Sequence, residues 1–265
     1  MGIVLGLEDS RALVTGAATG IGRAIAVWLA RAGCDVVIAD KDASGLDDAA
    51  AEIRATGRRA EAVLLDLRAK GAADELVEAT VGLLGALDVA VNNVGSLGGN
   101  DRGSFLDGDD AVFRDIVEQN LLLTAACCRA EARRMVEQGD GGVIVNVSSG
   151  ESTRPALDLA PYGAAKAAIN HLTQTLAVEL APHDIRVLAV APGTTLTPVV
   201  RAALSDEYVE RLVDSIPLGR LNEPDDLARI VVALASDLGV GVTGQLVLAD
   251  FGAHLSRNRP RLDPT

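Results

Sequence analysis

The sequence is short of basic residues, cysteines and histidines, and each shortage excludes a class of function. Its 24 Lys and Arg stand against 37 Asp and Glu, a formal net charge of −13. The phosphates of nucleic acid would be repelled, so nucleic acid is not an expected partner. The three cysteines (Cys34, Cys127 and Cys128) and three histidines lack the spacing of metal ligands, so no metal site is predicted.

Long apolar runs are also missing. Asp, Glu, Lys or Arg interrupts every apolar stretch before it reaches the length that spans a bilayer. The first residues lack the basic start and the full apolar core of a signal peptide. We therefore expect no membrane partner and a cytoplasmic location.

Apolar residues make up 49% of the chain and follow two alternating patterns. Runs rich in β-branched residues, typical of a parallel sheet covered on both faces, alternate with Ala- and Leu-rich runs typical of helices. This alternation predicts an α/β fold: one Rossmann-type, doubly wound domain with a mostly parallel seven-stranded sheet and helices on both faces. The domain is expected to occupy residues 1–265, with its core at 7–252 and a tail at 253–265. The expected strands are Ala12–Thr15, Asp35–Ala39, Ala60–Leu65, Leu87–Val91, Gly142–Val147, Ile185–Val190 and Gln245–Leu248, and the expected helices are Ile21–Ala32, Leu46–Thr56, Ala72–Leu84, Ala111–Glu137, Ala164–Leu180 and Asp225–Ser236.

A glycine-rich turn lies where the first strand should meet the first helix. Its glycines are spaced G-x-x-x-G-x-G rather than G-x-G-x-x-G. Glycines permit a tight turn and the close approach of a pyrophosphate to backbone N–H groups, and the positive end of the following helix points at that phosphate. The turn therefore predicts a dinucleotide cradle, with Gly16, Thr19, Gly20, Ile21 and Gly22 as candidate binding residues.

Asp40 is expected at the end of the second strand, 24 positions after Gly16. An acid there can accept hydrogen bonds from the adenosine ribose hydroxyls and repel a 2′-phosphate, which favours NAD over NADP. Lys41 leaves an alternative open, because it is either a solvated turn residue or a 2′-phosphate contact that permits NADP. NAD is the expected cofactor, with NADP as the alternative.

Two further strand ends carry residues expected beside the cofactor. Asp66, followed by Leu67, either caps the adenine end or only caps a turn. After the fourth expected strand, Asn93 can bridge backbone groups, Val94 still packs beside the cofactor and Gly95 leaves room for it.

Tyr162 and Lys166 stand four positions apart at the start of a long Ala-rich run. On a helix this spacing puts both side chains on one face. A phenol is a poor acid or base near neutrality, but a neighbouring ammonium favours the phenolate and lowers the pKa. The pair is therefore a candidate general acid–base unit for moving a hydroxyl proton.

In this order, the motifs resemble those of the short-chain dehydrogenase/reductase family. The resemblance runs from about Leu7 to Gly252 and implies a Rossmann domain that transfers hydride between a nicotinamide cofactor and a secondary alcohol or ketone. The matching residues are Thr15–Gly22, Asp40, Asp66, Asn92–Gly95, Asn120, Ser149, Tyr162, Lys166, Pro192–Thr197 and Ile216–Pro224. By the same resemblance, further cofactor contacts are Tyr162, Lys166, Pro192, Gly193, Thr195 and Thr197.

The resemblance also implies a catalytic tetrad. Ser149 precedes Tyr162 by 13 residues, the separation usual in the family, and is chosen over Ser148 for that reason. In the implied mechanism Ser149 hydrogen-bonds the substrate oxygen and Tyr162 exchanges a proton with it. Lys166 holds the nicotinamide ribose and lowers the pKa of the tyrosine, and Asn120 anchors a water that continues the proton path.

The expected substrate pocket lies between three segments, 94–97, 150–159 and 196–204. In relatives the last segment is often a mobile lid. Its mainly apolar residues favour an apolar or ring-bearing small-molecule substrate, unless the segment simply packs on the core. Arg154 either pairs with an acidic group of the substrate or is solvated. The candidate pocket residues are Gly150, Glu151, Arg154, Leu157, Leu196 and Val199.

The leading hypothesis is an NAD-preferring alcohol dehydrogenase or ketoreductase. One alternative is an NADPH-dependent ketoreductase on a carrier-bound or biosynthetic β-keto intermediate, which the acidic charge and Asp40 disfavour. Another is a catalytically silent dinucleotide-binding protein, which the intact tetrad disfavours. The resemblance also implies a homo-oligomer, a tetramer or dimer, built on the helices expected at 111–137 and 164–180.

Overall fold

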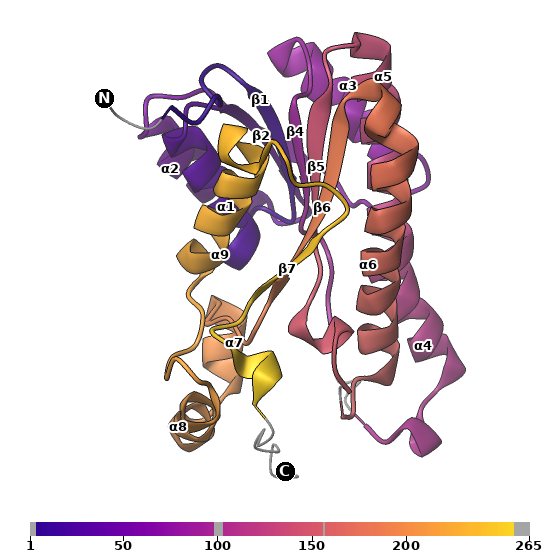
Figure 1. The fold of residues 1–265 in the computed structure, drawn as a ribbon, viewed down its shortest axis with the longest axis vertical. Coiled ribbons are helices and arrows are strands. Elements are labelled where there is room, and N and C mark those ends of the chain that lie inside the picture. Colours follow the sequence, from indigo (N-terminus) through magenta and orange to yellow (C-terminus); the bar gives the residue numbers. More distant parts are fainter. Residues whose placement is uncertain (1–3, 98–102, 156, 257–265) are drawn as a thin grey trace.

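The computed structural model describes residues 4–97, 103–155 and 157–256. A seven-stranded sheet in the order β3-β2-β1-β4-β5-β6-β7 forms its centre, and every neighbouring pair of strands is parallel (Figure 1). This confirms the predicted doubly wound α/β fold. The strands are β1 (Arg11–Thr15), β2 (Asp35–Asp40), β3 (Ala60–Leu64), β4 (Val89–Asn92), β5 (Gly142–Val147), β6 (Ile185–Pro192) and β7 (Leu246–Ala249).

Helices cover both faces of the sheet, as Figure 1 shows. On one face α1 (Gly20–Arg31), α2 (Ala43–Arg54) and α9 (Pro224–Ala235) pack over an apolar cluster that includes Ile25, Leu29 and Leu227. On the other face α3 (Ala72–Leu84), α5 (Leu123–Gln138) and α6 (Ala160–Leu180) enclose a second cluster. None of the helices in the described part of the chain combines the length and apolar character needed to cross a membrane.

The strand order reverses between β1 and β4, which are neighbours in the sheet although two strands separate them in the chain. At such a switch point the connections leave in opposite directions, and a crevice opens at the carboxyl ends of the strands. The glycine-rich turn after β1 and the Asn93–Gly95 segment after β4 meet here.

Two parts of the chain differ from the sequence-based expectation. The long helix expected at 111–137 is divided into α4 (Asp110–Val117), a π-helical turn (Glu118–Leu122) and α5. The segment after Thr197 forms α7 (Pro198–Ala203) and α8 (Asp206–Ser215), which the sequence reading did not assign as helices. The hydroxyls of Thr197 and Ser205 cap these two helices. Both are short and lie outside the strand–helix alternation, so periodicity did not reveal them.

The last described residues lie near the carboxyl ends of β6 and β7. Residues Ala253–Leu255 form a 3-10 turn that follows β7. The rest of the expected tail, 257–265, is outside the described residues.

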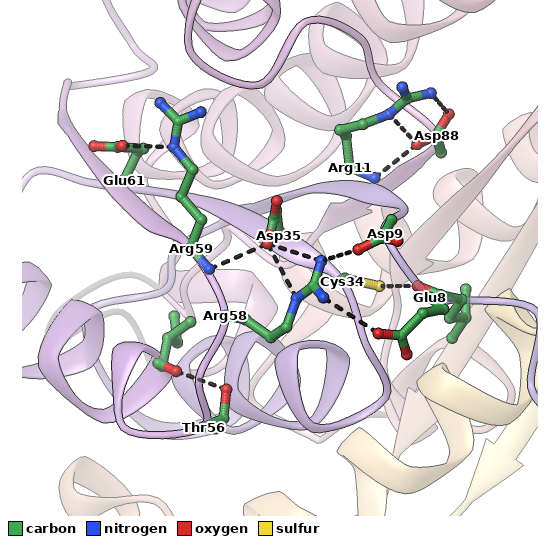
Figure 2. Close-up of polar contacts among 12 residues, drawn as sticks. Glu8, Asp9, Arg11, Cys34, Asp35, Thr56, Arg58, Arg59, Glu61 and Asp88 are labelled. Carbon is green, nitrogen blue, oxygen red and sulfur yellow. Dashed lines mark hydrogen bonds and ion pairs between the residues drawn. The ribbon is translucent and has the colours of Figure 1, made fainter.

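The opposite, amino-terminal edge of the sheet is joined by ion pairs (Figure 2). The Arg58 guanidinium pairs with Glu8 at 3.3 Å, Asp9 at 2.9 Å and Asp35 at 3.0 Å. Arg11, which begins β1, pairs with Asp88 just before β4 at 2.5 Å. These contacts tie the loop before β3 to the starts of the central strands, far from the edge that carries the cofactor turn.

Candidate active site

The turn after β1 has a backbone that only glycine accommodates. Gly16 and Gly20 have φ values of 64° and 57°, in the left-handed region. A Cβ on Gly22 would lie 2.1 Å from the carbonyl oxygen of Gly16. The missing side chains leave the amino end of α1 open toward the crevice, as a phosphate-binding turn requires. Thr19 and Ile21 flank Gly20 in this turn.

Hydrogen bonds of Asn93 join this turn to the end of β4. Its side-chain Nδ2 donates to the carbonyl of Gly16 at 2.9 Å and to that of Thr15 at 3.2 Å. In return, the Thr15 hydroxyl accepts from the backbone N–H groups of Asn93 and Val94 at 3.1 and 3.3 Å. The two sides of the switch point are therefore held at a fixed separation.

Asp40 lies at the carboxyl end of β2 and faces the glycine-rich turn. Its carboxylate accepts from the backbone N–H of Ala18 at 3.1 Å, of Lys41 at 2.7 Å and of Asp42 at 3.2 Å. These bonds fix the carboxylate beside the turn, where the predicted ribose contact would be. Lys41 is exposed.

Asp66 is exposed and accepts from the backbone N–H of Arg68 at 3.0 Å. That bond corresponds to the turn-capping alternative, and it leaves the adenine contact of Asp66 and its neighbour Leu67 a prediction. Leu67 itself is buried.

The segment after β6 forms the far wall of the crevice. Pro192 ends β6, and Gly193 lies so close to Asp250 that a Cβ would be 2.8 Å from the Asp250 Cβ. Thr195 is buried and bridges to Asn222. Thr197 caps α7, and its methyl group would lie 3.1 Å from a Cβ on Gly20. The segment thus reaches back to the glycine-rich turn.

The two serines after β5 face different partners. The Ser148 hydroxyl bonds to Asn170 Oδ1 at 2.6 Å and to the Lys166 carbonyl at 3.2 Å, so it braces α6. The Ser149 hydroxyl accepts from the backbone N–H of Glu151 at 3.2 Å and is hydrogen-bonded to Tyr162. Of the two serines, Ser149 is therefore the one beside the phenol.

Lys166 and Asn120 meet around Gly95. The Lys166 ammonium is buried, donates to the Val147 carbonyl at 2.9 Å and lies 5.7 Å from the centre of the Tyr162 ring. Asn120 is in the π-helical turn, where its Nδ2 donates to the carbonyls of Ser96 and Ile116 at 2.7 and 2.9 Å. A Cβ on Gly95 would be 2.7 Å from Asn120 Oδ1 and 3.1 Å from Lys166 Nζ. A glycine is required here by close packing of the two polar groups.

Asn120 Oδ1 is buried and has no hydrogen-bond partner among the described residues. A buried acceptor without a donor is costly, and ordered water is its usual partner. This oxygen is therefore suited to hold a water beside Lys166.

The pKa of Tyr162 differs from the sequence-based expectation. Burial raises the pKa of the phenol, the hydrogen bond with Ser149 lowers it, and the charge of Glu151 raises it further, so the net direction is upward. The predicted lowered pKa of Tyr162 is therefore wrong for this arrangement. The main reason is that the phenol itself is desolvated. The Lys166 ammonium, whose own pKa desolvation lowers to about 8, donates to the Val147 carbonyl.

The predicted substrate residues are only partly brought together. Glu151 and Arg154 form an ion pair at 3.6 Å, and Arg154 also donates to the Ala253 carbonyl at 2.9 Å. Both line an open cavity of about 420 Å³ between residues 151–155 of the loop after β5 and the first turns of α6. Gly150 is not among its lining residues.

The remaining predicted pocket residues lie elsewhere. Leu157 and Val199 are exposed. Leu196 packs against the apolar cluster under α8 that contains Tyr208 and Leu212.

Sequence reasoning missed several residues that support the site. Asn170 and Ser152 join the loop after β5 to α6 through a 2.8 Å hydrogen bond. Asn170 follows Lys166 by four positions, so helical spacing was a signal that could have identified it. The π-helical turn that presents Asn120 carried no recognisable sequence signal. In the described part of the chain, no three His, Cys, Asp or Glu side chains are placed to hold a metal ion.

Comparisons with known proteins extend over nearly the whole chain. A family model described as Enoyl-(Acyl carrier protein) reductase matches residues 16–254. L-rhamnose 1-dehydrogenase (NAD(P)(+)) from Azotobacter vinelandii (strain DJ / ATCC BAA-1303) is 42% identical over 251 residues, which are 93% of this chain and 97% of the relative.

Solved structures show the same likeness. Acetoin dehydrogenase from Enterobacter cloacae superposes with a TM-score of 0.85 at 36% identity, covering 97% of this chain and 99% of that one. 7α-Hydroxysteroid dehydrogenase, complexed with NADH and 7-oxo glycochenodeoxycholic acid, has a TM-score of 0.89 at 31% identity and covers 95% and 98%. The similarity therefore concerns whole chains and includes the crevice.

Proposed function

The chain belongs to the short-chain dehydrogenase/reductase family, and from this premise we propose that it interconverts a secondary alcohol and a ketone with Tyr162 as the proton-exchanging residue. It is an oxidoreductase that acts on CH–OH groups with a nicotinamide cofactor. The observation that carries the proposal is the grouping of Ser149, Tyr162 and Lys166 at the carboxyl ends of the strands.

Each residue of the proposed tetrad has a distinct task. The Tyr162 hydroxyl takes the proton of the substrate alcohol in oxidation and returns it in reduction. Ser149, already hydrogen-bonded to the phenol, donates to the substrate oxygen and holds it in place. Asn120 Oδ1 and Lys166 Nζ both lie close to the Cα of Gly95, so a water between them can pass the proton outward.

The crevice fits a dinucleotide. Gly16, Gly20 and Gly22 carry no side chains, and a Cβ at each would crowd its neighbours. The amino end of α1 faces the space that these glycines leave open. We expect these glycines to hold the pyrophosphate and Asp40 to hold the adenosine ribose. Asn93–Gly95 and Lys166 should contact the nicotinamide ribose. The nicotinamide end should contact Pro192, Gly193, Thr195 and Thr197. A bound nicotinamide cofactor supplies or accepts the hydride.

We propose NAD as the preferred cofactor, because three backbone bonds hold the Asp40 carboxylate in place and a fixed negative charge disfavours a 2′-phosphate. The test is titration of NADH and NADPH into the wild type, Asp40→Ala and the control Asp48→Ala, an exposed acid on α2. NADH preference in the wild type and control, relaxed in Asp40→Ala, is the expected result. Tighter NADPH binding by the wild type would contradict it.

The substrate is proposed to be a neutral secondary alcohol or ketone. The charge of Arg154 is engaged by Glu151 and by the Ala253 carbonyl, which disfavours its use on an acidic substrate. Relatives named for rhamnose, acetoin and a hydroxysteroid suggest the first panel to test. Turnover of neutral substrates with NAD, abolished in Tyr162→Phe, is expected. Cofactor binding without turnover of any panel member would instead favour the silent dinucleotide-binding protein.

Assembly and location are proposed from the same premise. Exposed apolar side chains at Leu122 and Val178, on the face that carries α5 and α6, suit a homo-oligomer, a tetramer or dimer. The cytoplasm is proposed as its location from the composition of the sequence. Light scattering of the purified protein tests this, and a monomer at micromolar concentration would contradict it.

A further inference from the structure

A fully buried polar cluster joins β4, β5, α5 and α6, the elements that lead into the proposed site. Figure 1 shows where these four elements lie in the fold. Asn92 and Asn146 are register partners on β4 and β5. Asn92 Nδ2 donates to Asn146 Oδ1 at 3.1 Å and to Glu131 Oε2 at 2.9 Å. Asn146 Nδ2 donates to Thr173 Oγ1 at 3.0 Å, and the Cys128 thiol lies 3.3 Å from Asn146 Oδ1. One chain of hydrogen bonds therefore joins four elements.

Those four elements carry the groups on which the proposed reaction depends. β4 runs into the Asn93–Gly95 segment, and β5 runs into Ser149. The π-helical turn of Asn120 continues directly into α5, which holds Glu131. Tyr162 and Lys166 lie on α6, the helix of Thr173. The cluster thus fixes the relative positions of all the elements that carry the tetrad.

Glu131 is the unusual member of the cluster. It is completely buried, and no ion pair joins it to a lysine, arginine or histidine in the described part of the chain. Burying an isolated carboxylate is strongly unfavourable, so such a group takes up a proton instead. Two acceptor oxygens here, Glu131 Oε1 and Asn92 Oδ1, have no hydrogen-bond donor among the described residues. A proton on Glu131 supplies a donor where one is lacking.

We infer that Glu131, held as the neutral acid, is a positioning residue that keeps the carriers of the proposed tetrad in register. The inference rests on the proposed function for its catalytic consequence, but the protonation of Glu131 can be tested without a substrate. In support, burial raises the pKa of Glu131 to about 7, against the opposing effect of the Asn92 hydrogen bond. The neighbouring elements contribute the amides of Asn92 and Asn146 and the hydroxyl of Thr173 to the cluster. The titratable groups beside Glu131 on α5 are the Cys127 and Cys128 thiols, whose pKa values burial raises.

Glu131→Gln and Glu131→Ala separate this role from simple packing, with Leu76→Ala on α3 as the matched control for a lost buried side chain. Glutamine is neutral, has the same shape and can still accept from Asn92. We expect Glu131→Gln to restore most of the activity, whereas Glu131→Ala lowers kcat on the order of 100-fold, the effect of a displacement of about 1 Å in a catalytic group. Leu76→Ala should lose stability without a comparable loss of kcat.

Infrared difference spectra of wild type against Glu131→Gln report the proton directly. At pH 6 the wild type should show the carbonyl stretch of a protonated carboxylic acid, which the variant lacks. Linkage gives a second readout. Folding raises the pKa of Glu131 from 4.5 to about 7. The contribution of Glu131 to the stability of the folded protein is therefore complete below pH 4.5 and is lost as the pH rises through 7. Glu131→Gln should therefore melt higher than the wild type at pH 8 and close to it at pH 5.

The inference is overturned if the protonated-acid band is missing at pH 6, or if Glu131→Ala and Leu76→Ala reduce kcat equally at equal loss of stability. Failure of the proposed function would look different: the wild type itself would bind no NADH or turn over no alcohol, while the infrared band would still be present.

Discussion

At the scale of single residues, removal from water controls the proton affinities in the site. Lys166 and Glu131 are both buried, and no opposite charge among the described residues pairs with either. Burial shifts the pKa of each in the direction that favours its neutral form, to about 8 for Lys166 and about 7 for Glu131. Tyr162 shifts the same way. Near neutrality, small environmental changes can therefore alter the charge of the site.

The lysine pKa can be measured directly, because the sequence contains only three lysines, at positions 41, 70 and 166. In the NMR spectrum of selectively labelled protein, the signal that Lys166→Arg removes should titrate at about pH 8. Since the ammonium is charged below this pH and neutral above it, NADH affinity should fall as the pH rises through 8. Lys70→Arg, an exposed position, serves as the control. A Lys166 signal that titrates above pH 10 would contradict this prediction.

At the scale of elements, the site is assembled where turns meet helix ends. The first turn of α1 approaches the Gly16 carbonyl and Asn93 so closely that the helix can begin there only with Gly22. By contrast, Gly82 in α3 has open space around its Cα. Two helical glycines thus have opposite roles.

Alanine at these two glycines should have opposite effects. Gly82→Ala should stabilise the fold by about 0.5–1 kcal/mol, because alanine is the better helix former. Gly22→Ala gains the same propensity, but its Cβ would lie 2.1 Å from a carbonyl oxygen, so the turn must shift and NADH binding should be lost. Urea unfolding and NADH fluorescence measure both. Unchanged NADH affinity in Gly22→Ala would show that the turn does not hold the cofactor.

Helix α7 is held mainly at its ends. None of its residues is buried, and Arg201 joins it to Glu223 at 2.6 and 2.8 Å and to the Leu196 carbonyl at 3.1 Å. An exposed pair contributes only about 0.2–1 kcal/mol to global stability, but it can restrain one short helix.

Arg201→Ala should therefore speed amide hydrogen exchange in 198–204 by roughly threefold or more while the melting temperature changes little. If 196–204 lines the substrate pocket, as the sequence predicts, substrate KM is expected to rise more than kcat falls. Arg133→Ala, which removes another exposed ion pair, is the control. Unaltered exchange in this segment would mean that the Arg201 contacts do not restrain α7.

At the scale of the whole molecule, the proposed site lies at the carboxyl ends of the strands, and a cluster of stabilising ion pairs lies at their amino ends. The carboxyl edge carries the strained turns and the buried polar groups. The amino edge carries the Arg58 cluster, in which three carboxylates surround one guanidinium whose side chain is 18% exposed (Figure 2). The hydrogen bond with Asp9 and the nearby carboxylates raise the pKa of Arg58. In a chain of net charge −13, this arrangement reduces repulsion between acids.

Arg58→Ala should cost about 1–2 kcal/mol of unfolding free energy, with a smaller cost at high salt, since ions screen the acids that it leaves unpaired. NADH affinity should stay the same, because the site is at the other edge. Arg59→Ala is the control, since Arg59 is 51% exposed and pairs with Glu61 alone. Urea unfolding at two salt concentrations tests this, and equal costs for the two variants would contradict it.

Features that depend on residues close together in the chain could be predicted from the sequence, and features that depend on distant residues could not. Strand–helix alternation predicted the sheet, and residues fixed by a turn, such as Gly16 and Gly22, were recognisable from spacing. The net shift of the Tyr162 pKa was predicted in the wrong direction, because helical spacing gives proximity but not burial. Asn170, Ser152 and Glu131 were missed, since their partners are brought near only by folding. The catalytic roles of Asn120, Ser149, Tyr162 and Lys166 stay predictions.

The sequence by itself determined the fold class, the family and the order of the cofactor motifs, because these depend on periodicity and on residue types at short spacing. Only the tertiary structure decided which serine faces Tyr162, that Asn120 sits in a π-helical turn, and that α7 and α8 exist as helices. It also decided which groups lose water. Desolvation depends on packing from all directions, and residues as distant in the chain as Asn92 and Thr173 supply that packing around Glu131.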